Sequence, residues 1–86
     1  MPRVEMYVRS WCGYCARARA ILAAHGVEPE EYDVTFDALR RAEMIARSGG
    51  RTTVPQIFVD GQHLGGCDDL EALEQAGDLG RWLERP

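Results

Sequence analysis

Cys12-Gly13-Tyr14-Cys15 is the stretch that decides the fold of this chain, because it joins a strand-like run to a helix-like run. Residues 4–8 before it alternate as a strand does, and residues 16–25 after it have helical spacing. A C-x-x-C pair at such a junction is a redox signature. Cys12 falls where the free N–H groups and the dipole of a helix favour a thiolate, which is the nucleophile in thiol chemistry. Cys15 follows one turn later on the same face and can close a disulfide, so the stretch predicts dithiol–disulfide exchange.

Hydrophobic patterns along the rest of the chain predict a small α/β domain. Asp60-Gly61 is a hairpin turn signal between two strands, and Leu39, Ala42 and Ile45 mark the expected inner face of the second helix. The expected elements are strands over 31–34, 54–59 and 62–64, a helix capped by Asp37, a helix capped by Asp68 or Asp69, and a short terminal helix with Leu79, Trp82 and Leu83.

The order β-α-β-α-β-β-α predicts a four-stranded mixed sheet with helices on both faces. Strands separated by a helix are expected to be parallel, and the last two strands, joined by a tight turn, antiparallel.

Length and composition restrict the class of protein. The chain has 86 residues, of which 45% are hydrophobic, so we expect one globular domain over residues 1–86. The net charge of -4 argues against nucleic-acid binding. No run approaches the roughly 18 apolar residues of a membrane span, and the N-terminus lacks the layout of a signal peptide. We therefore expect no membrane partner and a cytoplasmic location, where a C-x-x-C is more often catalytic or metal-binding than a structural disulfide.

Four segments together resemble the glutaredoxins, which have a thioredoxin-like fold. They are the dithiol motif at 12–15, Thr53-Val54-Pro55, Gly65-Gly66 and Cys67-Asp68-Asp69, in the order and spacing of the family. The stretch from Arg51 to Phe58, with the following Gly65 to Leu70, is similar to the small bacterial glutaredoxins of the third type. The resemblance covers nearly the whole chain. It implies a glutathione-dependent thiol–disulfide oxidoreductase that reduces protein disulfides and protein–glutathione mixed disulfides.

The resemblance also implies a role for each matching residue. Cys12 matches the nucleophile and Cys15 the resolving thiol. Pro55 matches a cis-proline that presents the backbone of Val54 to the cysteinyl part of glutathione. The remaining residues expected to bind glutathione are Arg9 near its glycine carboxylate, Tyr14 beside the nucleophile, Thr53, and Gly66, Cys67 and Asp68 at its γ-glutamyl end. Arg51 or Gln56 is a further candidate at the glycine carboxylate.

Two departures from the family pattern keep other functions open. Gly13 stands where many dithiol glutaredoxins have Pro, and some relatives with Gly there bind a [2Fe–2S] cluster between two subunits through the nucleophilic cysteine and glutathione. An iron–sulfur carrier, monomeric until it is loaded as a dimer, is therefore an alternative in which Cys12 ligates the cluster. Trp11 gives W-C-G, as at the start of the thioredoxin motif, and motivates a third alternative, a reductant charged by a flavoenzyme. Thioredoxin continues with Pro where this chain has Tyr14, which argues against that alternative.

A structural zinc site is the less favoured interpretation of the cysteine pair. Zinc usually takes four ligands in two pairs, and only Cys67, His25 and His63 remain. For Cys67 itself, a role as a small buried residue is favoured over a chemical role.

The family resemblance finally implies ribonucleotide reductase as one protein that a glutaredoxin supplies with electrons.

Overall fold

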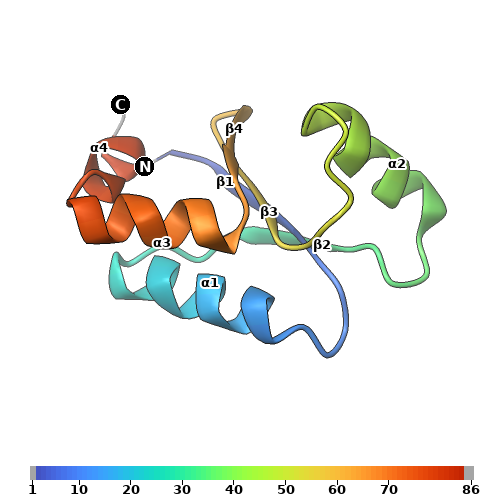
Figure 1. The fold of residues 1–86 in the computed structure, drawn as a ribbon, viewed down its shortest axis with the longest axis horizontal. Helices are drawn as coiled ribbons and strands as arrows, with labels where there is room; N and C mark the ends of the chain where they lie inside the picture. The colour runs from blue at the N-terminus through green and yellow to red at the C-terminus, as the bar shows by residue number, and fades with distance from the viewer. Residues whose placement is uncertain (1, 85–86) are drawn as a thin grey trace.

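The computed structural model describes residues 2–84 and places a four-stranded sheet among helices (Figure 1). The elements follow the predicted order, including the short terminal helix. They are β1 (Val4–Val8), α1 (Gly13–Ala24), β2 (Glu30–Asp33), α2 (Ala38–Arg47), β3 (Gln56–Val59), β4 (Gln62–Gly65), α3 (Cys67–Ala76) and α4 (Leu79–Leu83). No helix in this part of the chain has the length and the apolar character needed to cross a bilayer.

The sheet is mixed, in the order β2-β1-β3-β4. β1 pairs with β2 in parallel, and β3 pairs with β4 antiparallel across a turn in which Asp60 and Gly61 have positive φ angles of 49° and 81°. β3 runs antiparallel to β1, and so also to β2, from which α2 separates it in the chain. The expectation that strands separated by a helix are parallel is therefore correct for β1 and β2 and wrong for β2 and β3. The reason is the path after α2: the chain returns to the end of the sheet where β1 finishes, and β3 starts from that end.

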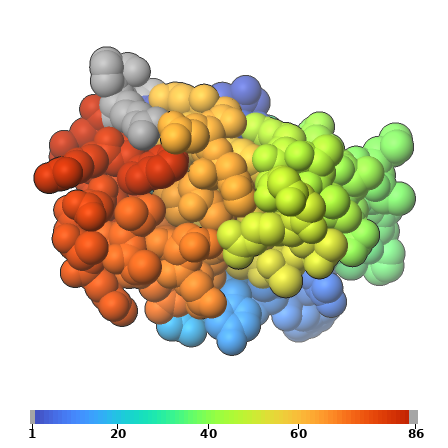
Figure 2. Space-filling model, turned by 45° about the horizontal axis from the view of Figure 1, so that its top comes forward, coloured from blue at the N-terminus to red at the C-terminus, as the bar shows by residue number. Residues whose placement is uncertain are grey.

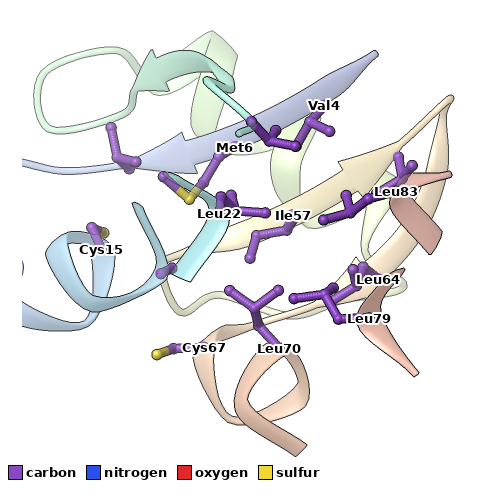
Figure 3. Packing of buried hydrophobic residues seen from close by; sticks show 14 residues of the cluster. Val4, Met6, Cys15, Leu22, Ile57, Leu64, Cys67, Leu70, Leu79 and Leu83 are labelled. Atoms are coloured by element: carbon purple, nitrogen blue, oxygen red, sulfur yellow. The ribbon is translucent and has the colours of Figure 1, made fainter. Parts of the chain in front are cut away.

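Helices α1, α3 and α4 cover one face of the sheet and form the larger core. Figure 1 shows α1 and α3 side by side, with α2 set apart from both. Met6 of β1, Leu22 of α1, Ile57 of β3 and Leu70 of α3 are all 0% exposed and point toward one another (Figure 3). Trp82 packs partly buried against this core, as expected. This packing fixes the start of α1 relative to the start of α3.

Helix α2 covers the opposite face, but of the three residues predicted to face inward only Ile45 packs there, partly buried. Leu39 is 85% exposed, and the fully buried residue is Met44, which packs with Tyr7, Val34 and Phe58. Two arginines complete the inner face of the helix: the Arg40 guanidinium lies 4.1 Å from the centre of the Tyr32 ring, and that of Arg47 lies 4.1 Å from the centre of the Phe58 ring. The apolar pattern failed because cation–π stacking puts arginine on the buried side.

A buried ion pair ties the same helix to β1. Glu5 is 6% exposed, and its carboxylate accepts hydrogen bonds from Arg47 Nη2 at 3.0 Å and from the Tyr32 hydroxyl at 2.8 Å. The hydrogen bond from Arg47 holds the pKa of Glu5 below its usual value. Both faces of β1 are covered, so all five of its residues are buried. Val54, just before β3, packs against both the larger core and the Tyr7 cluster.

Candidate active site

Cys12 caps the N-terminus of α1. Its backbone is extended, with φ -104° and ψ 106°, and its Sγ accepts a hydrogen bond from the Cys15 backbone N–H at 3.1 Å. Because Cys12 is the cap, α1 begins at Gly13 rather than at residue 16 as expected. An N-cap atom faces the free N–H groups and the positive end of the helix dipole, which stabilise negative charge on it. The predicted setting of Cys12 at a helix start is confirmed.

Cys15 has the opposite environment. Its side chain is 1% exposed, and burial, together with hydrogen bonding to Cys12, raises the pKa of its thiol to about 12. Both cysteines are free thiols. A partly exposed thiol at the helix cap therefore stands beside a buried thiol that stays protonated, which fits an attacking and a resolving role.

The segment before β3 brings a backbone edge to Cys12. The Val54–Pro55 peptide bond is cis, as expected, and the Val54 carbonyl oxygen lies 4.0 Å from Cys12 Sγ. Gln56 is fully buried and donates from Nε2 to the Thr53 carbonyl at 3.0 Å, while its Oε1 lies 2.7 Å from Nε2 of the half-buried His63. The idea that Gln56 contacts the glycine carboxylate of glutathione is therefore wrong: the side chain supports the segment from inside.

The start of α3 is held by one carboxylate. Gly66 is the N-cap, rather than Asp68 or Asp69 as expected; Asp69 instead accepts with Oδ2 from the Gly66 N–H at 2.8 Å and from Arg51 Nη1 at 2.9 Å. A Cβ on Gly65 would lie 2.3 Å from that same oxygen, and the φ of Gly65 is 128°. The glycine pair thus leaves room for Asp69 to fold back over the turn.

These three segments enclose a groove of about 280 Å³. In the space-filling view the segment before β3 lies against β4 and the start of α3, with the start of α1 below them (Figure 2). Of the residues expected to bind glutathione, the groove brings together Tyr14, Thr53, Val54, Pro55, Gly66, Cys67 and Asp68, and Arg51, the further candidate at the glycine carboxylate, lines it too.

Arg9 lies outside the groove, whereas Cys67 lines it with a thiol that is already hydrogen-bonded. Arg9 does not line this groove but a neighbouring hollow that also includes Trp11, and Val54 belongs to both. Cys67 is buried, donates from Sγ to Glu71 Oε1 at 3.2 Å, and has its pKa raised to about 11, first by burial. An inert Cys67 thiol matches the favoured structural interpretation.

Sequence reasoning missed the supports of the groove, which are the pairs of Asp69 with Arg51 and of Gln56 with His63. An acidic residue three positions after a helix cap is a capping-box signal and indicates Asp69. The other partners are distant in sequence and carry no local signal. Within residues 2–84, no group of three or more His, Cys, Asp or Glu side chains is placed to hold a metal ion.

Comparison with known proteins gives consistent matches. The glutaredoxin family model matches residues 4–64. Glutaredoxin 3 of Escherichia coli K12 is 54% identical over 79 residues, which are 92% of this chain and 94% of that protein. The solution structure of glutaredoxin from Brucella melitensis is 51% identical, with a TM-score of 0.84 over 98% of this chain and 90% of that one. A crystal structure of a buckwheat glutaredoxin–glutathione complex is 25% identical, with a TM-score of 0.84 over 95% of this chain and 76% of that one.

Proposed function

This chain belongs to the glutaredoxin family, with its thioredoxin-like fold and thiol–disulfide oxidoreductase chemistry, and we propose that it uses glutathione to reduce protein disulfides and protein–glutathione mixed disulfides. The observation that carries the proposal is Cys12, a helix-capping thiol 4.0 Å from a backbone carbonyl that borders a groove. The glutathione complex of the buckwheat relative supports the same ligand here.

The groove and the neighbouring hollow together offer a partner for each part of glutathione. The Val54 backbone is free to pair with the cysteinyl unit as an added strand would. First-turn N–H groups of α3, at Cys67 and Asp68, have no partner within the helix and suit the γ-glutamyl carboxylate. The exposed Asp68 carboxylate suits the γ-glutamyl ammonium. Tyr14 and Thr53 border the bound tripeptide, and Arg9 suits its glycine carboxylate.

Reduction of a mixed disulfide then needs Cys12 alone. The Cys12 thiolate attacks the glutathione sulfur, the S–S bond breaks, and the protein thiolate leaves and takes a proton from water. A second glutathione, as its thiolate, attacks the Cys12–glutathione disulfide, releases oxidised glutathione and restores the Cys12 thiolate. Each exchange forms one S–S bond and breaks one, and the two glutathiones supply the two electrons.

A protein disulfide requires Cys15 as well. Cys12 forms a mixed disulfide with the substrate, and Cys15 loses its proton as it attacks Cys12 Sγ, so the second substrate thiolate leaves and is protonated. Two glutathiones reduce the resulting Cys12–Cys15 disulfide. The high pKa of Cys15 keeps it protonated until this step, which protects the first attack from a competing thiolate. A reducing compartment such as the cytoplasm provides the glutathione.

The test is turnover of a glutathionylated peptide with glutathione, glutathione reductase and NADPH. We expect Cys12→Ser to abolish NADPH consumption, Cys15→Ser to retain it, and Cys67→Ser to match the parent as a control. With a protein disulfide as substrate, Cys15→Ser is expected to fail. Equal loss in the Cys12 and Cys15 variants on the glutathionylated peptide would defeat the division of roles.

An iron–sulfur carrier is the second candidate, because Gly13 is exposed and a Cβ there would meet no atom within 4 Å. The described residues supply only Cys12 as a ligand at this surface, so a [2Fe–2S] cluster would need a second subunit and glutathione thiols to complete its ligand set. Such a cluster would supply electron or cluster transfer. A colourless monomer after anaerobic reconstitution with iron, sulfide and glutathione would exclude this candidate.

A further inference from the structure

An ion pair joins the two helices whose starts border the groove. Arg17 of α1 donates from Nη2 to Oε2 of Glu71 in α3 at 2.7 Å. The two helices lie side by side (Figure 1), and the groove is lined by Tyr14 at the start of α1 and by Cys67 at the start of α3. Arg17 follows Tyr14 by one helical turn, and Glu71 follows Cys67 by one turn. The ion pair therefore links α1 to α3 directly behind the groove.

Each member of the ion pair also contacts a side chain of the groove. The Arg17 guanidinium carbon lies 5.9 Å from the centre of the Tyr14 ring, within the roughly 6 Å range of a cation–π contact. The second carboxylate oxygen of Glu71, Oε1, accepts a hydrogen bond from Cys67 Sγ at 3.2 Å. A chain of contacts thus runs from one side of the groove to the other. Arg17 and Glu71 do not line the groove themselves, so they act on its shape.

The proposed mode of glutathione binding depends on the separation of the two helix starts. The sulfur of glutathione must reach Cys12, which caps α1. Its γ-glutamyl carboxylate is expected at the first-turn N–H groups of Cys67 and Asp68 in α3. One tripeptide therefore spans both helices, and a small shift of α3 relative to α1 misplaces one of its ends.

A second ion pair joins the same helices away from the groove. Nε2 of His25, the residue that caps the end of α1, lies 2.6 Å from Oε2 of Glu74 in α3. Glu74 comes one turn after Glu71 on the same helix, and neither His25 nor Glu74 lines the groove. The chain thus provides its own control, because one link lies behind the groove and the other at the opposite end of α1.

We propose that Arg17 and Glu71 are positioning residues for glutathione, because their ion pair holds the start of α3 against the start of α1 and so sets the width of the groove. The inference rests on the proposed use of glutathione at Cys12 and adds two residues to that site. Loss of either residue frees the two sides of the groove to move apart and removes the support of the Tyr14 ring. Since the pair acts as one unit, loss of one member has the same effect as loss of both.

The test measures KM and kcat for a glutathionylated peptide in the parent protein and in Arg17→Gln, Glu71→Gln and the double variant. We expect each of these variants to raise KM by about threefold and to keep kcat, because the pair contributes equally to binding of the substrate and of the transition state. The double variant is expected to match the single variants. Glu74→Gln makes the same change one turn along the same helix and is expected to keep the parental KM.

Two further measurements separate the groove from the thiol chemistry. Alkylation of Cys12 by iodoacetamide, followed by mass spectrometry, should proceed at the parental rate in Arg17→Gln and Glu71→Gln, since the helix cap is intact. A changed rate would move the effect from the groove to the thiolate and overturn the proposal. NMR titration of the Cys12→Ser protein with S-methylglutathione measures binding without exchange, and both variants should weaken it by the same factor as KM. Urea unfolding checks that each variant is folded.

The titration also distinguishes failure of this inference from failure of the proposed function. If the parent protein does not turn over the peptide, the proposed function fails, and the affinities for S-methylglutathione decide the role of Arg17 and Glu71. If the parent turns over the peptide but both variants match it in KM and affinity, the proposed function stands and the positioning role fails. No binding of S-methylglutathione to the Cys12→Ser protein would also overturn the positioning role.

Three kinetic results would contradict positioning by the pair. A lower KM in Glu71→Gln with a higher KM in Arg17→Gln would mean that the freed guanidinium binds glutathione itself. An equal rise of KM in Glu71→Gln and Glu74→Gln would assign the effect to helix packing in general. Additive losses in the double variant would show that Arg17 and Glu71 act independently.

Discussion

The protonation of Cys15 can be tested by its reaction with iodoacetamide in a protein where it is the sole cysteine, Cys12→Ser/Cys67→Ser. Only the thiolate reacts. The ordinary pKa of 9.0 leaves about a tenth of a thiol ionised at pH 8, and a pKa of about 12 leaves about one ten-thousandth. Burial, the largest cause of the raised pKa, remains in this variant while the contribution of Cys12 is removed, so we expect alkylation in the folded protein to be slower than in the same protein unfolded in urea by up to about a thousandfold.

Mass spectrometry of timed samples measures this ratio, and its pH dependence separates ionisation from access. If burial acts through the pKa, the rate rises about tenfold for each pH unit up to about pH 10 without a plateau. The matched control is the Cys15→Ser/Cys67→Ser protein, in which the partly exposed Cys12 should react without this suppression. A plateau of the Cys15 rate near pH 9, or a suppression of less than tenfold, would refute the assignment of Cys15 as a protonated resolving thiol.

Three further predictions concern the supports of the fold. Arg47→Met leaves the Glu5 carboxylate buried and unpaired, and urea unfolding should show a loss of about 3 kcal/mol; a loss under 1 kcal/mol would contradict a structural role for the pair. Because the pKa of Glu5 is lowered on folding, the stabilisation from its carboxylate is complete above the ordinary pKa of 4.5 and is lost as the pH falls below that value. Glu5→Gln should therefore reduce the fall of the urea midpoint at acidic pH. An unchanged fall in the variant would contradict this contribution of Glu5. Gly65→Ala forces a Cβ against Asp69 in a left-handed backbone and should cost roughly 2–4 kcal/mol in the same assay, whereas Gly13→Ala, with open space around it, should cost little; equal effects would disprove the clash.

Local patterns predicted the redox centre because its residues are contiguous. Cys12 and Cys15 lie at the expected strand-to-helix junction. The segments at 53–55 and 66–68, which only the family resemblance indicated, meet in one groove. The strand and helix order followed from the same short-range signals. What remained hidden depends on partners far apart in sequence: Arg51 with Asp69, and Gln56 with His63.

Helix α2 shows why apolarity alone misplaced a face. Of the predicted stripe Leu39, Ala42 and Ile45, only Ile45 packs toward the sheet. The rest of the side turned to the sheet is Arg40, Met44 and Arg47. The two guanidiniums each lie 4.1 Å from the centre of an aromatic ring that the sheet presents on this side. Aromatic residues on β2 and β3 therefore set the orientation of α2 about its axis, whereas the apolar residues of the helix itself predicted a different orientation.

The position of Val54 makes its methyl groups a probe for ligand binding by NMR. Its side chain packs against the hydrophobic clusters on both faces of the sheet, and its backbone borders both the groove and the neighbouring hollow. A molecule bound on either side changes the surroundings of a residue that both clusters share. One isotope-labelled valine methyl pair would therefore register occupancy of either site, and would do so without a chemical tag near the reactive thiol.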